Sequence, residues 1–177
     1  MHSSTHFFLE TDRLWLVNCN RAILENLFEG DAQLAKYLGI NILEKWTEFG
    51  EPAFRWTWDA LEKHPGTERW WAYLPVLKAE NMLVGTCGYT GFPTAEGVVE
   101  IGYEIAEVYR NKGLATELVQ ALVQQAFTDA QVVKVQAHTL PEENASNHIL
   151  KKCGFEYAGE ATDPDEGTVW KWGLVKP

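Results

Sequence analysis

The spacing of hydrophobic residues changes several times along the N-terminal third of the chain. Over residues 13–18 apolar and polar residues alternate, which predicts a half-buried strand. Over residues 20–38 the apolar residues recur every three or four positions on both sides of Gly30, which predicts two short helices. Residues 51–63 show a similar spacing, with Pro52 in a first-turn position that tolerates proline. A strand followed by three helices is therefore expected.

The middle of the chain contains three extended runs and the start of a long helix. Residues 70–78 and 81–91 are joined by a short turn, which predicts a hairpin. The alternation over residues 98–106 predicts a strand that pairs with the second run. From Leu114 onward the apolar residues follow one helical stripe, so we expect an antiparallel meander followed by a helix.

The C-terminal part alternates shorter elements. Residues 132–138 predict a strand, and residues 143–154 predict a helix that ends at a glycine. Residues 155–160 and 168–175 predict a final antiparallel pair. The order of these elements, without an internal repeat or a linker, predicts an α+β fold in one domain over residues 1–177.

The composition is that of a globular protein, and it narrows the possible functions. The 177 residues carry a formal net charge of −10, which argues against broad nucleic-acid binding, since that needs a basic surface. No apolar run approaches the roughly 20 residues that span a bilayer. The N-terminal MHSSTHFFLE lacks the basic and apolar regions of a signal peptide. Cys19, Cys87 and Cys153 lack the spacing of a zinc site, so we expect a reduced, cytoplasmic protein.

The negative charge is unevenly distributed along the chain. Residues 1–109 hold 8 basic and 16 acidic residues, whereas residues 110–177 hold 7 and 9. An anionic ligand should therefore prefer the C-terminal part, and a cationic substrate should be drawn to the N-terminal part.

A short glycine motif, YRNKGLATELVQAL over residues 109–122, lies where the long helix begins. Arg110 and Lys112 supply positive charge there. Gly113 permits close approach to the backbone, and Asn111 tolerates a left-handed conformation. Because a helix N-terminus exposes unpaired N–H groups, the stretch is either a phosphate cradle or an ordinary strand-to-helix turn. It has neither the Gly-Lys-Ser/Thr of a P-loop nor a three-glycine dinucleotide fingerprint.

Five landmarks along the chain point to a known family. They are TDRLWL at 11–16, EIGY at 100–103, RNKGLA at 110–115, ATE at 115–117 and SNHILKKCGF at 146–155. Together they resemble the GNAT acetyltransferase superfamily, and more specifically its ribosomal-protein alanine N-acetyltransferase-like (RimJ/RimL-type) branch, whose acetyl-CoA loop reads Gln/Arg-x-x-Gly-x-Gly/Ala. The resemblance implies a GNAT-like fold, with a central, mostly antiparallel mixed sheet flanked by helices.

The resemblance also implies the reaction and the cofactor site. Enzymes of this family transfer an acetyl group from acetyl-CoA directly to a primary amine in a ternary complex. The developing oxyanion would accept a hydrogen bond from a backbone N–H of the strand over residues 98–106. Acetyl-CoA binding is assigned to residues of the glycine motif, the strand before it and the late helix: Ile105, Arg110, Asn111, Lys112, Gly113, Leu114, Ala115, Thr116 and Asn144.

Three residues are predicted to be catalytic by the same resemblance. Glu100 matches a glutamate that acts as a base through water, and Glu104, on the same strand face, is a second candidate base or an anchor for the amine. Ser146 matches a serine near the thioester sulfur, to which its hydroxyl would donate a hydrogen bond. The alternatives are that both glutamates are solvated strand carboxylates and that Ser146 caps the helix or lies on its surface. Tyr103 and Tyr157 are alternative donors, or aromatic residues of the core and the final hairpin.

The sequence departs from the branch at two positions. Asn111 stands where glycine is usual, and Glu143 stands where the branch has an asparagine that contacts the pantetheine arm. Either the backbone shifts so that Asn144 makes this contact, or the contact is weaker. Glu143 is expected to face solvent.

Other conspicuous residues are expected to have structural roles. Cys153 should pack in the core rather than act as a nucleophile, since direct transfer needs no acyl-enzyme. His138 and His148 form no ligand pattern with a cysteine or an aspartate, so no metal is expected. Most of five tryptophans should be buried, with one or two walling the acceptor site: Trp46, Trp56, Trp58, Trp70 and Trp71.

The leading hypothesis is an acetyl-CoA-dependent N-acetyltransferase. Its acceptor is a protein N-terminus, an amino acid, a polyamine or an amine-bearing antibiotic. The alternative is a non-catalytic module of the same fold that binds acyl-CoA, which would have no reason to keep both Glu100 and Ser146. Neither a nucleic acid nor a membrane is expected as a partner, and both a monomer and a homodimer fit the sequence.

Overall fold

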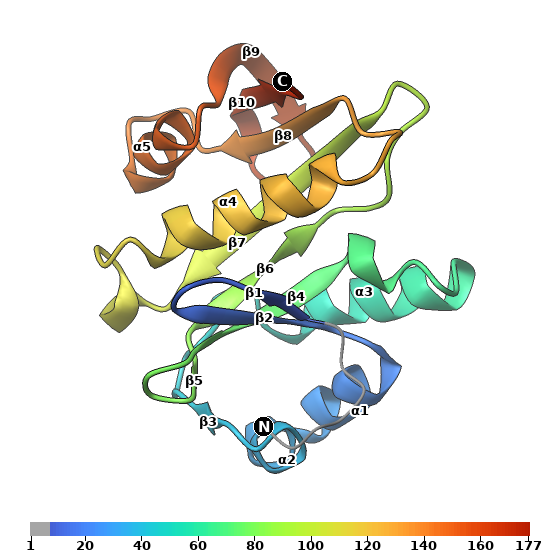
Figure 1. Ribbon diagram of the computed structural model, residues 1–177, viewed down its shortest axis with the longest axis vertical. Coiled ribbons are helices and arrows are strands. Elements are labelled where there is room, and N and C mark those ends of the chain that lie inside the picture. The colour runs from blue at the N-terminus through green and yellow to red at the C-terminus, as the bar shows by residue number, and fades with distance from the viewer. Residues whose placement is uncertain (1–7) are drawn as a thin grey trace.

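The strands of the protein form one sheet with helices packed on it (Figure 1). The structure is a computed structural model that describes residues 8–177. In this part of the chain the strands are β1 (Phe8–Glu10), β2 (Leu14–Asn18), β3 (Asn41–Ile42), β4 (Ala72–Leu77), β5 (Met82–Leu83), β6 (Gly85–Tyr89), β7 (Val98–Ile105), β8 (Lys134–Thr139), β9 (Glu156–Asp163) and β10 (Gly167–Val175). The helices are α1 (Arg21–Glu29), α2 (Asp31–Leu38), α3 (Gly50–Lys63), α4 (Leu114–Phe127) and α5 (Ala145–Lys152).

The sheet has the strand order β1-β2-β4-β6-β7-β8-β10-β9, while β5 pairs with β4 and β3 pairs with β5. Neighbouring strands are antiparallel except for β7 with β8 and β3 with β5. The α+β class and the mixed, mostly antiparallel sheet expected from the sequence are therefore confirmed.

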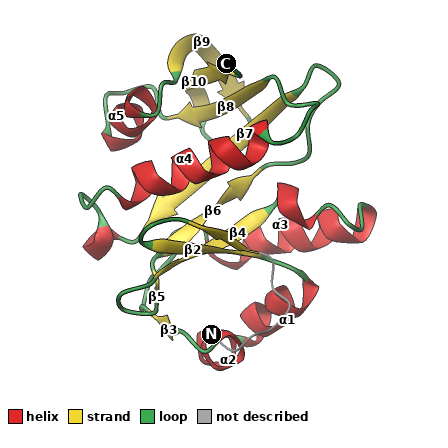
Figure 2. Ribbon diagram, viewed as in Figure 1, coloured by secondary structure: helices red, strands yellow, loops and turns green. Residues whose placement is uncertain are grey.

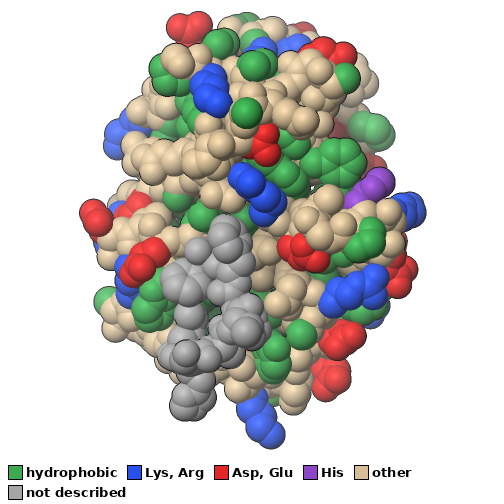
Figure 3. All heavy atoms as spheres, turned by 45° about the vertical axis from the view of Figure 1, so that its right-hand side comes forward, with side chains coloured by type: hydrophobic (Ala, Val, Ile, Leu, Met, Phe, Trp, Pro, Cys, Tyr) green, Lys and Arg blue, Asp and Glu red, His purple; other side chains and the backbone are tan. Residues whose placement is uncertain are grey.

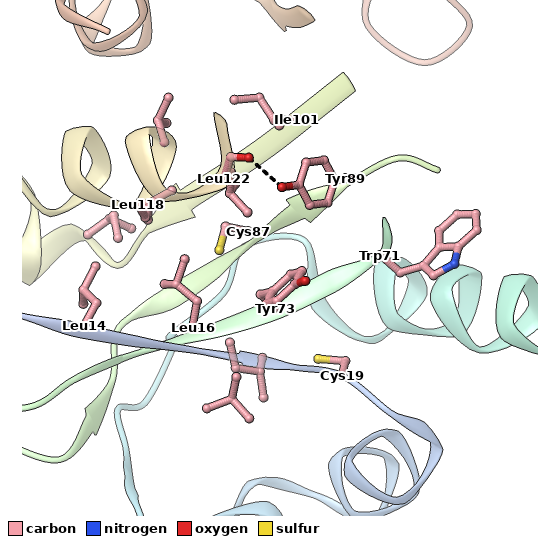
Figure 4. Packing of buried hydrophobic residues seen from close by; sticks show 14 of the residues in the cluster. Leu14, Leu16, Cys19, Trp71, Tyr73, Cys87, Tyr89, Ile101, Leu118 and Leu122 are labelled. Carbon is pink, nitrogen blue, oxygen red and sulfur yellow. Dashed lines mark hydrogen bonds between the residues drawn. The ribbon is translucent and has the colours of Figure 1, made fainter. Parts of the chain in front are cut away.

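Helix α4 crosses one face of the sheet over β7 (Figure 2). Leu118 and Leu122 are buried on α4 and point toward the sheet, where Ile101 of β7 is also buried (Figure 4). The Tyr89 hydroxyl donates a hydrogen bond of 2.6 Å to the carbonyl oxygen of Leu122. Apolar burial and this hydrogen bond together fix α4, and with it the glycine motif, relative to β7.

Most of the elements expected from hydrophobic spacing are present. The side chain of Asn20 caps α1 by accepting a hydrogen bond of 2.9 Å from the N–H of Ile23. Gly30, with φ of 120°, separates α1 from α2 as expected. The helix predicted over residues 51–63 and the strand predicted over residues 98–106 are confirmed as α3 and β7.

The predicted hairpin over residues 70–91 differs from the structure in two details. Its first strand begins only at Ala72, because a 3-10 turn occupies Glu68–Trp70. Its second strand is split into β5 and β6, because one extra residue lies between Leu83 and Cys87 relative to the facing part of β4. Such a bulge interrupts a strand that the sequence shows as one continuous extended run.

Some expectations concern residues that the structure does not describe. The absence of a signal peptide was inferred from residues 1–10, of which 1–7 lie outside the described part, and the domain boundary at residue 1 stays a prediction. Within residues 8–177, no helix is both long enough and apolar enough to cross a membrane.

Candidate active site

Strands β7 and β8 lie side by side at one end and separate at the other. They pair from Val98 with Lys134 to Glu100 with Gln136, and no further. On its other edge β7 continues to pair with β6 as far as Ile105. The separation leaves an opening in the sheet next to the second half of β7.

Backbone groups of β7 line this opening. Glu100 accepts a hydrogen bond of 3.0 Å from the N–H of Thr90, and the N–H of Ala106 donates one of 2.8 Å to Val84, so the even-numbered residues bond toward β6. Because hydrogen bonds alternate along an antiparallel strand, the amides of Ile101 and Tyr103 point the other way. The pairing of Glu100 with Gln136 uses the amide of Ile101 to bond β8, so Tyr103 is the first residue whose amide faces the opening. This amide lies on the strand whose backbone is expected from the sequence to meet the acyl group.

The glycine motif lies just beyond the end of β7. Asn111 and Gly113 both have left-handed conformations, with φ of 60° and 77°, as their residue types allow. Helix α4 starts at Leu114, and Gly113 supplies no side chain to cap it. The first amides of α4 therefore have no side-chain partner from the capping position, which is the arrangement an anion requires.

The predicted cofactor residues of the motif differ in what they expose. Leu114 is buried, so it offers its backbone rather than its side chain, whereas Ala115 and Thr116 are half-buried. The side chain of Arg110 donates from Nε to the carbonyl oxygen of Ile105 at 2.8 Å. This hydrogen bond ties the end of β7 to the beginning of the motif.

Arg13 holds the motif from the other side, which the sequence analysis did not anticipate. Its Nη1 donates to the carbonyl oxygen of Lys112 at 2.8 Å, and its Nε lies 2.7 Å from Oε2 of Glu117. The backbone N–H of Arg13 and the hydroxyl of Thr11 donate to the other carboxylate oxygen of Glu117, at 2.8 and 2.5 Å. Partial burial raises the pKa of Glu117, but the hydrogen bonds from Thr11 and Arg13 outweigh it and the pKa is lowered.

The face of β7 turned away from α4 carries the two predicted base candidates. Glu100, Gly102 and Glu104 share this face because side chains alternate along a strand. Gly102 is exposed, and a side chain placed on it would have nothing within 4 Å. Glu100 and Glu104 stand about 13 Å apart along the strand. This separation is between their backbones, and the two carboxylates have different partners.

A hollow of about 130 Å³ lies beside Gly102 on this face. Its lining includes Trp56 and Thr57 of α3. Phe49, which directly precedes α3, and Thr90, which follows β6, also line it. The side chains of Phe49 and Trp56 are 57% and 52% exposed, which is unusual for large aromatic residues. Hydrophobic side chains are also exposed among acidic and basic ones on the face shown in Figure 3.

The carboxylate of Glu104 is engaged in a turn rather than free. It accepts hydrogen bonds of 3.1 and 3.2 Å from the backbone N–H of Glu48, and another from the hydroxyl of Thr47. These bonds hold the segment that leads into α3 against β7. Glu104 thereby supports one wall of the hollow.

The carboxylate of Glu100 has side-chain partners on β8. His138 places Nδ1 at 2.8 Å from Oε1 of Glu100, and Gln136 donates from Nε2 to Oε2 at 3.2 Å. The side chains of Glu100 and His138 are 28% and 26% exposed, so solvent reaches both. The sequence analysis considered His138 only as a metal ligand and did not connect it with Glu100.

Ser146 and Tyr103 meet at the start of α5. The Tyr103 hydroxyl lies 3.5 Å from the carbonyl oxygen of Ser146, a long hydrogen bond. Burial raises the pKa of Tyr103 to about 12, and a hydrogen bond with Ser146 partly opposes the shift. Tyr103 therefore keeps its proton near neutral pH and is available as a hydrogen-bond donor. Tyr157 is instead exposed in an aromatic cluster of the final hairpin, with Trp170 and Trp172 at ring distances of 5.8 Å.

Asn144 and Glu143 lie in the turn before α5. The Oδ1 of Asn144 caps the helix by accepting a hydrogen bond of 3.1 Å from the N–H of Asn147, which leaves its Nδ2 for a ligand. Glu143 is 61% exposed and lies 3.4 Å from the ammonium of Lys151. The expectation that Glu143 faces solvent is confirmed.

The cysteines and tryptophans are mainly structural. Cys153 lies between α5 and α4 with Sγ at 3.8 Å from the carbonyl oxygen of Thr116, and burial raises the pKa of its thiol, which fits the expected packing role. Of the tryptophans considered above, Trp46, Trp70 and Trp71 are buried and Trp56 lines the hollow. Among residues 8–177, no three His, Cys, Asp or Glu side chains are grouped as ligands of one metal ion.

Comparison with known proteins identifies the family of the chain. A family model described as an acetyltransferase (GNAT) domain matches residues 13–156. The chain belongs to the GNAT acetyltransferase family. It is 31% identical over 151 residues to YjdG, an uncharacterised N-acetyltransferase of Bacillus subtilis (strain 168), covering 83% of this chain and 88% of that protein.

Two further relatives of this GNAT enzyme differ in their acceptors. An aminoglycoside N(6')-acetyltransferase type 1 of Klebsiella pneumoniae is 41% identical, but only over 59 residues, which cover 33% of this chain and 29% of that protein. A solved structure of a putative ribosomal-protein-serine acetyltransferase from Vibrio cholerae superposes with a TM-score of 0.69, at 18% identity and over 96% and 98% of the two chains. At such low identity the superposition shows the fold alone.

The GNAT family assignment establishes the general activity. The protein is an N-acetyltransferase that uses acetyl-CoA. The predicted site residues fall at the opening between β7 and β8, around the glycine motif and at the start of α5. Arg13 and His138 are the residues that sequence reasoning missed at this site. The only sequence signal for Arg13 was its place in TDRLWL, and His138 had none.

Proposed function

We propose that this GNAT enzyme acetylates a primary amine that enters the hollow beside Gly102, by direct attack on acetyl-CoA in a ternary complex. One observation carries the proposal. The hollow lies on one face of β7 and the glycine motif lies at the end of the same strand, so the opening beside β7 connects them. A donor and an acceptor that approach from these two sides would meet at Gly102.

The residues around the opening fit the chemistry of acetyl-CoA. The pyrophosphate would accept hydrogen bonds from the amides between Asn111 and Thr116, with Lys112 and Arg110 adding positive charge. The pantetheine arm would run past Ile105 along the free amides of β7, and Nδ2 of Asn144 would reach it from α5. The acetyl carbonyl would accept from the amide of Tyr103.

We infer different roles for the predicted catalytic residues. The base function belongs to the Glu100 end of the hollow, because the carboxylate of Glu104 is occupied by Thr47 and the backbone of Glu48. Ser146 and Tyr103 would donate hydrogen bonds to the sulfur as it leaves. A thiolate with an ordinary pKa near 8.5 needs only such a bond, and no full proton transfer from a tyrosine.

The lining of the hollow favours an amine next to an apolar group. Phe49 and Trp56 offer aromatic surface, and the acidic residues of the N-terminal part attract a cation. A peptide N-terminus with an apolar first side chain meets both conditions. Its α-amine, with a pKa of about 7.7–8.0, is neutral roughly a tenth of the time at pH 7. We therefore propose a protein N-terminus as the acceptor, in keeping with the RimJ/RimL-type branch.

An aminoglycoside amine is the second candidate. It is favoured by the short stretch of 41% identity to an aminoglycoside acetyltransferase. An aminoglycoside carries several ammonium groups and hydroxyls, for which the apolar hollow offers few partners, so we rank it below a peptide.

Thiol release in the presence of an amine panel tests the proposal. The panel contains short peptides with free N-termini and apolar or charged first residues, 2-phenylethylamine, spermidine and kanamycin. We expect the highest kcat/KM with the apolar N-termini. A preference for kanamycin would transfer the proposal to the second candidate. A rise in Tm with acetyl-CoA, without release of CoA above the hydrolysis rate for any amine, would favour a non-catalytic binding module.

A further inference from the structure

A histidine and a carboxylate meet where β7 and β8 separate. Glu100 is the last residue of β7 that pairs with β8, and His138 lies two residues beyond its partner Gln136. Both side chains point to the face that carries the hollow, since Gln136 and His138 alternate with the buried Val135, Ala137 and Thr139. The pair therefore stands between the hollow and the narrow end of the opening.

The hydrogen bonds of the pair determine the tautomer of the neutral imidazole. Oε1 of Glu100 lies 2.8 Å from Nδ1 of His138, so Nδ1 carries the hydrogen and donates it to the carboxylate. Gln136 donates to the second oxygen, Oε2, at 3.2 Å. Each carboxylate oxygen accepts one of these bonds, and in this tautomer Nε2 is the imidazole nitrogen that carries the basic lone pair.

We propose that His138 accepts the proton of the attacking amine, and that Glu100 is a positioning residue that holds the imidazole. This inference rests on the proposed function and names the base of that site. An imidazole accepts a proton near neutral pH more readily than a carboxylate does, which suits a general base. A carboxylate behind the imidazole also stabilises the imidazolium that forms.

The proton and the electrons balance over the two steps. The neutral amine attacks the thioester carbon, so a C–N bond forms and the carbonyl π electrons move to oxygen. The nitrogen passes one proton to Nε2 of His138. When the carbonyl re-forms, the C–S bond breaks and its electron pair leaves on the sulfur of CoA. The imidazolium then gives the proton to that thiolate, so the products are the amide and CoA.

Three charged groups lie around His138. Glu100 faces it from β7, and Lys171 of β10 is its partner in the sheet register. Asp163, at the end of β9, has a lowered pKa, mainly because the backbone N–H groups of Glu166 and Asp165 donate to it and to a smaller extent because of His138. The carboxylates of Glu100 and Asp163 and the ammonium of Lys171 are thus the charges near the histidine. The pH profile of activity depends on all three groups.

Replacement of the histidine tests the proposal. His138→Gln should lower kcat/KM for the best peptide of the panel by about 10²–10⁴-fold, the usual contribution of a general base. The KM for acetyl-CoA should not change. The acid limb of the pH profile should disappear, and added imidazole should restore part of the activity of His138→Gly. His148→Gln, an exposed change on α5, is the matched control and should leave kcat/KM unchanged.

Glu100→Gln separates a positioning role from a direct one. If Glu100 acts through His138, its replacement lowers kcat/KM less than His138→Gln does, keeps an acid limb, and adds nothing in the double variant. An unchanged acid limb in His138→Gln, with no rescue by imidazole, would overturn the proposal in favour of Glu100 itself. If the unmodified enzyme acetylates no amine of the panel, it is the proposed function that fails.

Discussion

The backbone N–H and the guanidinium of Arg13 both bind the carboxylate of Glu117, at 2.8 and 2.7 Å, although 104 residues separate them in the chain. The same guanidinium donates to the carbonyl oxygen of Lys112. The turn between β1 and β2 is thereby fastened to the first turn of α4 and to the glycine motif. The conformation of the cofactor loop thus depends on a residue that lies outside it.

Removal of this side chain should weaken cofactor binding. In Arg13→Ala the loop before α4 loses its hydrogen bond at Lys112, and part of the binding energy is then needed to order it, so the Kd of acetyl-CoA should rise about fivefold or more. The free energy of unfolding should fall by about 1–2 kcal/mol, because hydrogen bonds to a charged group are lost at a partly exposed site. Calorimetric titration and urea unfolding measure the two effects.

The control is an exposed arginine that does not contact the loop and whose guanidinium lies 4.9 Å from the ring of Trp58. Arg21 lies 3.7 Å from Glu62, with both side chains at least half exposed. Arg21→Ala should leave the Kd of acetyl-CoA unchanged and lower the free energy of unfolding less than Arg13→Ala does. Equal effects of the two replacements would mean that Arg13 does not order the loop.

The Glu117 interaction should also depend on pH. The pKa of Glu117 is lower in the folded protein than in the unfolded chain, so the stabilisation is present above the unfolded pKa and is lost as the pH falls through the folded pKa. Glu117→Gln should therefore lower Tm clearly at pH 7 and much less at about pH 3. A Tm difference between the two proteins that is the same at both pH values would contradict this assignment.

The glycine motif gives a sharper test of the cofactor site. Gly113→Glu places a carboxylate at the predicted pyrophosphate site on a backbone with φ of 77°, so acetyl-CoA binding should weaken by at least about 100-fold. Gly66 has a similar φ of 82° and open space around it, which makes Gly66→Glu a control for strain and charge. Acetyl-CoA should raise the Tm of Gly66→Glu and leave that of Gly113→Glu unchanged. Equal rises would exclude the motif as the binding site.

A larger side chain at Gly102 would fill the hollow that we propose for the acceptor. Gly102 is not in a left-handed conformation and has free space above it, so Gly102→Leu should fold normally and occupy the space next to Trp56. The kcat/KM for an apolar peptide N-terminus should fall about 100-fold, because the amine can no longer take its place. The Kd of acetyl-CoA serves as the internal control and should stay the same. Unimpaired acetylation would place the acceptor elsewhere.

The order and type of the longer elements could be predicted because each has a regular hydrophobic period. The two halves of residues 20–38 and the strand over 98–106 were found in this way. The split of the second hairpin strand was not found, since a bulge removes the alternation. Strands β1 and β3, with three and two residues, are too short to show a period.

Only those parts of the site that consist of a local sequence motif could be predicted. Left-handed Asn111 and Gly113 follow from residue type, and they were anticipated. The bonds from Arg13 to Glu117 and from His138 to Glu100 join residues 104 and 38 positions apart, and no local pattern reports such contacts. The hydrogen bonds between Glu104 and the turn before α3 could not be predicted for the same reason.

The short junction between β7 and β8 has a mechanical consequence. Only three residue pairs connect β8, and with it β10 and β9, to the rest of the sheet. Among the described residues, the C-terminal block of β8, α5, β9 and β10 otherwise contacts the rest of the protein chiefly where α5 packs against α4, and a bound cofactor in the gap would add contacts. A cofactor that forms hydrogen bonds on both sides of the gap would hold the two parts of the sheet together. Amides of β8–β10 should therefore exchange with deuterium more slowly when the cofactor is bound. The enzyme would then be most rigid when it is ready to react and would loosen each time CoA departs.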